Sequence, residues 1–87
     1  MNNNQLYAKA LLKWGKWPQV NMAIEEMSEL TKELCKNLRG RHNKEQIAEE
    51  IADVEIMLGQ MKLLYQCQDE VDSYKHSKLT RLEVMVR

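Results

Sequence analysis

The 87-residue chain contains no phenylalanine, one proline and three glycines. Without phenylalanine, the core has to be built mainly from leucine, isoleucine, valine and the six methionines. The scarcity of glycine and proline, together with little strand-like alternation, favours helices over sheets. No apolar run approaches the roughly 20 residues that a membrane span needs, so we expect no membrane partner.

The chain also lacks an excess of charge of either sign, since 13 basic residues balance 13 acidic ones. A binder of nucleic-acid polymers normally carries a basic excess, and we therefore expect no such partner. The polar first residues lack the apolar stretch of a signal peptide, which makes the cytoplasm the expected compartment. Cys35 and Cys67 are far apart and form no CxxC motif, so we expect reduced, half-buried thiols.

The length allows one domain, residues 1–87, and the pattern predicts an all-α fold with about four helices. Gly15 and Gly40 mark helix ends, and Pro18 suits the first turn of the second helix. Asn43 and Gln46 have the spacing of a capping box, while the polar stretch 68–70 suggests a break. The predicted helices cover approximately 5–13, 18–38, 43–67 and 71–86.

Apolar residues recur at helical spacing in the two long central segments. Gly59 interrupts the second of these segments at a cost of about 1 kcal/mol relative to alanine, which a close approach of another helix would explain. A chain this small cannot cover both stripes, so we expect self-association into a homodimer or homotetramer. The stripes are Val20, Ala23, Met27, Leu30, Leu34 and Leu38, and Ile47, Ile51, Val54, Leu58, Met61 and Tyr65.

Two acidic pairs, Glu26-x-x-Glu29 and Glu50-x-x-Asp53, lie beside these stripes. Residues three apart on a helix point the same way, so two packed helices can direct four carboxylates to one place. Four carboxylates suit a hard divalent cation such as Mg²⁺, which usually keeps positions open for substrate phosphates. Glu33 has a phase that makes it a candidate fifth carboxylate. The alternative is that these acids are solvated helix faces.

Helical phase separates these acids from their neighbours. Glu25 and Glu49 lie nearly opposite the apolar stripes, so we expect both to face water. In each pair one acid, Glu26 or Glu50, lies close to the core edge of its stripe, and the other, Glu29 or Asp53, lies farther out.

Two segments of the chain carry a resemblance to a known family. They are Trp-Gly-Lys-Trp-Pro-Gln-Val-Asn-Met-Ala-Ile-Glu-Glu-Met-Ser-Glu-Leu and, later, Glu-Glu-Ile-Ala-Asp-Val-Glu-Ile-Met-Leu. In this order they resemble the MazG-like branch of the all-α nucleoside triphosphate pyrophosphohydrolases. Members of that family carry EExxE, a spacer and then ExxD. In this chain the motifs are residues 25–29 and 50–53, and the resemblance covers roughly residues 14–65. Residues 74–82 resemble, more loosely, the basic closing helix of small members.

The resemblance implies a MazG-like helical bundle with a four-helix core that is completed by oligomerisation. It also implies hydrolysis of nucleoside triphosphates to monophosphates and pyrophosphate, for nucleotide pool control or house-cleaning. The cofactor would be Mg²⁺, with Mn²⁺ as an alternative. The residues matching the metal ligands and catalytic acids are Glu26, Glu29, Glu50 and Asp53.

Other residues are candidate substrate contacts. Trp14 and Trp17 could stack on a base, and the alternative is that both pack as core or dimer contacts. Gln19 and Asn21 could bond to a base or sugar or lie exposed. In the last helix, the cations that could bind the triphosphate, or remain solvated, are Lys78 and Arg81, with Lys75 similarly placed.

Two alternatives to the hydrolase stay open at this stage. One is a non-catalytic helical nucleotide-binding or protein-interaction module of the same fold. The other is a hydrolase of this fold that acts on a different phosphorylated substrate.

Overall fold

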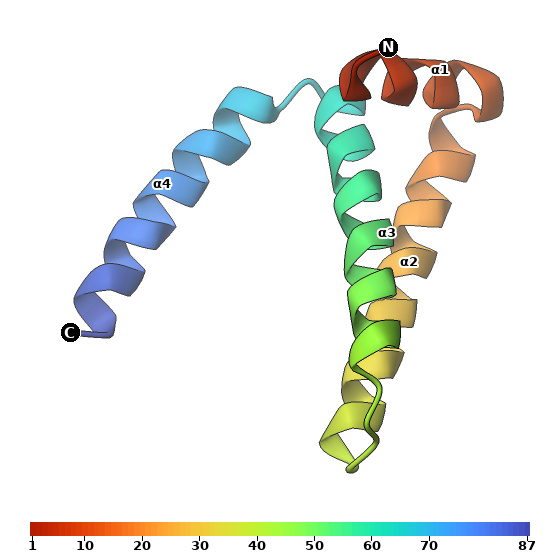
Figure 1. The fold of residues 1–87 in the computed structure, drawn as a ribbon. Helices are drawn as coiled ribbons and strands as arrows, with labels where there is room; N and C mark the ends of the chain where they lie inside the picture. Colours follow the sequence, from red (N-terminus) through yellow and green to blue (C-terminus); the bar gives the residue numbers. More distant parts are fainter.

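The computed structural model describes residues 1–87 and is entirely helical (Figure 1). This confirms the expected all-α class and the number of helices. None of the helices combines the length and the apolar character that crossing a membrane requires. The helices are α1, Asn3–Trp14; α2, Lys16–Leu38; α3, Lys44–Leu64; and α4, Gln68–Met85.

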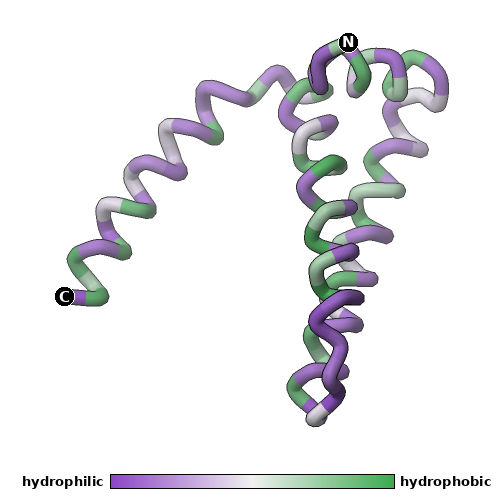
Figure 2. Tube along the Cα trace, in the orientation of Figure 1, coloured by the Kyte–Doolittle hydropathy of each residue, from purple (hydrophilic) through white to green (hydrophobic).

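The helices α2 and α3 form a long antiparallel hairpin, and α1 lies across its open end (Figure 1). The helix α4 extends away from this hairpin and packs against no helix other than α3. Apolar residues occur along α4, although α3 is the only helix that contacts it (Figure 2). Within the single chain, α1, α2 and α3 therefore pack into a three-helix unit, and α4 projects from it.

Several helix ends follow from local chemistry. Asn2 and Gln5 form a capping box at the start of α1, in which each side chain accepts a hydrogen bond from the other residue's backbone N–H. Gly15 separates α1 from α2 with a φ of 88°, a conformation that favours glycine. Pro18 lies in the first turn of α2, as expected.

The predicted capping box at Asn43 and Gln46 is wrong. Asn43 does precede α3, but its side chain makes no capping hydrogen bond. The Asn43 amide instead donates to the carbonyl oxygen of Glu33 at 2.8 Å, and its side-chain oxygen accepts from Asn37 at 3.3 Å. Because these bonds join the end of α2 to the start of α3, Asn43 closes the hairpin rather than capping one helix.

The chain breaks between α3 and α4 earlier than predicted. Gln66 has a φ of 51°, and α4 begins at Gln68, so the polar stretch 68–70 is the first turn of a helix rather than a break. Asp69 and Glu70 suit this place because negative charge is favourable at a helix N-terminus.

Gly59 allows α1 to approach α3 closely. This close approach explains why a glycine lies in the middle of α3. A Cβ atom at this position would lie 2.5 Å from Cε2 of Tyr7. The ring of Tyr7 therefore occupies the space that any larger residue at position 59 would need.

The contact between α2 and α3 is turned toward the acidic side of each predicted apolar stripe. Of the stripe residues only Ala23, with 2% exposed, is fully buried, whereas Met27, Leu58 and others remain substantially exposed. Some of the positions at which α2 and α3 face each other carry polar side chains. Much of the apolar surface of the two helices therefore lies outside their contact and remains exposed. The buried residues are Gln19, Ala23, Asn43, Met57 and Gln60.

Candidate metal centre

Three carboxylates converge where α2 and α3 face each other. Glu26 comes from α2, and Glu50 and Asp53 come from one face of α3, where residues three apart point the same way. One oxygen from each of the three groups lies within 4.8 Å of the other two, and all three residues are half-buried. The antiparallel packing of two acidic helices thus produces a compact cluster of oxygen atoms.

The environment of the cluster favours protonation of two of its acids. Burial raises the pKa of Glu26, and the negative charges of Asp53 and Glu50 raise it further. Protonated Glu26 can also donate a hydrogen bond to the Asp53 carboxylate, which raises the pKa of Glu26 in the same direction. Burial also raises the pKa of Glu50, with the charge of Asp53 as the next cause. The structure therefore gathers carboxylates in a place where their ionised forms are energetically unfavourable.

No basic side chain neutralises these three carboxylates. The ion pairs of the structure join Lys36 to Glu33 at 3.4 Å and Arg87 to Glu83 at 3.6 Å. The Oε2 atom of Glu50 is enclosed and has no hydrogen-bond partner. Unpaired carboxylate oxygens gathered in this way are the donor set that a hard divalent cation prefers, so the residues fit Mg²⁺.

The remaining acids of the motifs lie farther out. Glu29 is exposed and is not part of the group of three, although its charge contributes to the raised pKa of both Glu26 and Glu50. Glu33 is half-buried, and its charge also contributes at Glu50. Glu25 and Glu49 are exposed, as their helical phase predicted.

The aromatic candidates lie at the junction of α1 and α2. Trp14 and Trp17 each expose more than half of their surface. The ammonium group of Lys13 lies 5.3 Å from the ring centre of Trp14, and that of Lys16 lies 4.6 Å from the ring centre of Trp17. Both indoles are thus exposed enough for a ligand to reach, although a lysine ammonium group lies over one face of each ring.

The polar candidates beside them differ from each other. Asn21 is exposed, whereas Gln19 is buried against α3. Sequence inspection overlooked Gln60, which is buried near Gln19. Its spacing could have revealed it, because Gln60 lies seven residues after Asp53 and thus on the same helical face.

The basic candidates are not brought to the carboxylates within one chain. Lys78 and Arg81 line a shallow hollow on α4 together with Tyr74 and Ser77. Since α4 projects away from α2, these cations stand apart from the acidic cluster (Figure 1). Lys75 borders a different, mainly apolar hollow between α3 and α4.

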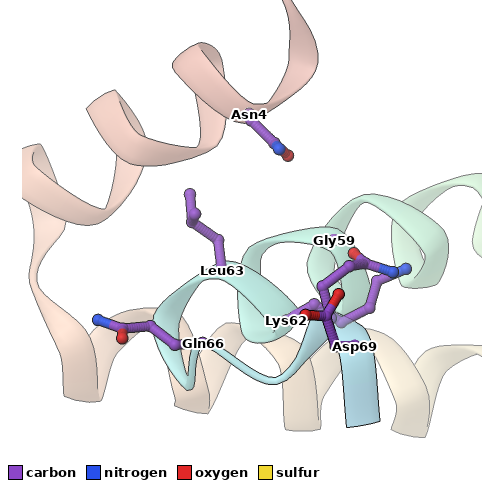
Figure 3. Close-up of a pocket in the computed structure, with 7 residues that line it drawn as sticks. Asn4, Gly59, Lys62, Leu63, Gln66 and Asp69 are labelled. Carbon is purple, nitrogen blue, oxygen red and sulfur yellow. The ribbon is translucent and has the colours of Figure 1, made fainter. Parts of the chain in front are cut away.

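A further cavity of about 240 Å³ lies where α1, α3 and the start of α4 meet. Figure 3 shows Asn4 pointing from α1 toward the last turns of α3, with Gln66 and Asp69 at the margin. None of the residues predicted to bind metal or substrate lines this cavity.

The two cysteines form no disulfide bond. Cys67 is half-buried as expected, but Cys35 is exposed, so the expectation of a half-buried thiol is wrong there. The reason is the rotation of α2, which turns the side chain of Cys35 outward.

Comparison with protein-family models, with curated proteins and with solved structures gives no match for this chain. The chemistry of the site therefore has to be inferred from its residues. The feature that carries most weight is the convergence of Glu26, Glu50 and Asp53 from two helices.

Proposed function

We propose that the protein is a Mg²⁺-dependent nucleoside triphosphate pyrophosphohydrolase that releases a nucleoside monophosphate and pyrophosphate. The observation that carries the proposal is the convergence of Glu26, Glu50 and Asp53, which have no basic partner. The motifs in which these acids lie, and their resemblance to the MazG-like family, give the reaction class.

The carboxylates of the cluster bind the metal ion in this proposal. Glu26, Glu50 and Asp53 hold a divalent cation, and Glu29, on the exposed side of α2, is the fourth candidate ligand. A cation bound there would polarise phosphate oxygens and lower the pKa of an attacking water. The same cation would offset the repulsion among the neighbouring carboxylates that contributes to the raised pKa values of Glu26 and Glu50.

Assembly into a homodimer or homotetramer belongs to the same proposal. The uncovered apolar residues of α3 and α4 support it, because a single chain leaves them in water. A second copy would also offer a route by which Lys78 and Arg81 could approach phosphates bound at the acidic cluster.

The test is a screen of ribo- and deoxyribonucleoside triphosphates with Mg²⁺, in which monophosphate and pyrophosphate are measured separately from diphosphate and orthophosphate. We expect monophosphate and pyrophosphate, because the resemblance implies cleavage between the α and β phosphates. Release of orthophosphate alone would contradict the proposal, and replacing Mg²⁺ with Mn²⁺ should preserve the products.

A second candidate is a nucleotide-binding module of this fold that does not turn its ligand over. The position of α4 favours it, because the single chain places no cation beside the carboxylates. In that case nucleoside triphosphates should bind with Mg²⁺ and be recovered intact after long incubation. The hydrolase and the binding module are thus separated by one measurement.

A further inference from the structure

A cavity of about 320 Å³ lies between the end of α1, the start of α2 and the second half of α3. Its lining is mainly apolar and combines one aromatic ring with two carboxamide side chains. The residues that line it are Trp14, Pro18, Gln19, Met22, Met57 and Gln60.

This cavity adjoins the acidic cluster along both helices. Met22 precedes Glu26 by four residues, and Met57 follows Asp53 by four. Because α2 and α3 are antiparallel, these two steps of about one helical turn lead in the same direction, toward α1 (Figure 1). A ligand that extends from the carboxylates toward α1 therefore enters this cavity.

Gln60 has a side chain that the fold leaves without a partner. It is only 6% exposed, and its Oε1 atom is enclosed and accepts no hydrogen bond. An amide buried in this way lowers stability, because it loses water without gaining another bond. Gln19, also 6% exposed, lines the same cavity from α2. The unpaired Oε1 atom of Gln60 at the wall of this cavity is explained if a ligand supplies the missing hydrogen bond.

We propose that the cavity holds the base of the nucleotide and that Gln60 accepts a hydrogen bond from an N–H group of that base. This inference rests on the proposed function, which places the phosphates at the carboxylates. The terminal torsion of a glutamine is broad, so the carboxamide turns toward the cavity at little cost. A carboxamide donates as well as accepts, and it therefore matches the paired donor and acceptor on the edge of a base. Trp14 supplies an aromatic face at the mouth of the cavity.

The test compares Gln60→Leu with the wild-type protein, because leucine has a similar size and no polar atom. We expect the Tm without ligand to rise, since an unpaired buried amide is removed. The KM for the preferred nucleoside triphosphate should rise roughly tenfold with little change in kcat, as one hydrogen bond to the base is lost. Hydrolysis of tripolyphosphate, which has no base, should be unchanged. Gln46→Leu, on an exposed part of α3, is the matched control and should leave all these values as they are.

A binding measurement separates this inference from the hydrolase proposal. Uridine, cytidine, adenosine and guanosine monophosphates are titrated calorimetrically without divalent cation into wild-type protein and Gln60→Leu. Weaker binding of the best ligand to the variant supports the base pocket even if no triphosphate is hydrolysed. Turnover with unchanged KM and unchanged monophosphate affinity in Gln60→Leu overturns the pocket and leaves the hydrolase proposal standing. A lower Tm for Gln60→Leu with unchanged binding would identify Gln60 as a purely structural residue.

Discussion

Glu26 and Asp53 face each other across the α2–α3 contact, with carboxylate oxygens within 4.8 Å, although they lie on different helices. Burial and the negative charge of Asp53 are the first two causes that raise the pKa of Glu26. Two like charges so close together are unfavourable unless a proton or a cation lies between them. We therefore expect this pair to link the stability of the fold to pH and to divalent cations.

The first prediction concerns metal binding at the cluster. Glu50→Gln should weaken Mg²⁺ binding by at least tenfold, because a neutral amide replaces one of three converging carboxylates. Isothermal titration calorimetry measures this, and circular dichroism should show that the helices persist. Glu49→Gln is the matched control, since Glu49 is exposed on the same helix and should bind no metal. Equal Mg²⁺ affinity in the Glu50→Gln protein and the wild type would remove Glu50 from the ligand set.

The second prediction concerns pH. Because the pKa values of Glu26 and Glu50 are raised by folding, the folded state binds more protons than the unfolded state above about pH 4.3, the ordinary glutamate value. The contribution of these acids to stability is therefore present at low pH and is lost as pH rises through their folded pKa values. Without metal, urea unfolding should show this fall, and Glu26→Gln should reduce it.

Mg²⁺ should reverse this trend at neutral pH. A cation that binds only the folded state raises the free energy of unfolding, and protons compete with it for the same oxygens. The increase in Tm caused by Mg²⁺ should therefore be larger at pH 7.5 than at pH 5. A Tm increase that does not depend on pH would argue against binding at these carboxylates.

The third prediction concerns self-association. Leu58 and Tyr65 lie on the part of α3 that the single chain leaves about half exposed. Sedimentation at micromolar concentration should give a dimer or tetramer, and Leu58→Lys should shift it toward monomer because a charge would have to be buried. Gln46→Lys places the same charge at an exposed position about 120° around α3 from Leu58 and should leave the assembly intact. A wild-type monomer with full turnover would show that assembly is dispensable.

The fourth prediction concerns the cations of α4. If Lys78 and Arg81 bind the phosphates in the assembled protein, replacing either with alanine should raise KM or lower kcat roughly tenfold or more, since a charge-assisted hydrogen bond contributes about 1.5–3 kcal/mol. Steady-state kinetics measures this. Arg87→Ala, a nearby cation paired only with Glu83, should have little effect. Equal kinetics in all three variants would identify the cations of α4 as solvated.

The fifth prediction concerns the contact between α1 and α3. Gly59→Ala should lower the free energy of unfolding by about 1–3 kcal/mol through overpacking against Tyr7, offset in part by about 1 kcal/mol of helix propensity. Urea unfolding measures the difference. In a Tyr7→Ala background the clash is absent, so the same substitution at position 59 should stabilise the protein. A stabilising effect in both backgrounds would mean that Tyr7 moves aside freely.

Local sequence patterns were sufficient for the helices and for several of their ends. The scarcity of glycine and proline and the apolar periodicity predicted the all-α fold, because both act within a few turns of one helix. The helix end at Gly15 and the outward direction of Glu25 and Glu49 were also predictable, because each depends only on residues within one helix or one turn. The spacing of Glu50 and Asp53 likewise required only that α3 be helical.

Tertiary packing decided which side of each helix faces its neighbour. Periodicity predicted that Met27 and Leu58 would lie near the core, yet both stay partly exposed while Glu26 and Gln60 turn inward. Helical phase specifies the angles between side chains on one helix, but the rotation of that helix about its axis depends on everything that packs against it. The sequence by itself thus determined which acids share a face, and only the tertiary structure brought Glu26 to Asp53 and left Gln60 without a partner.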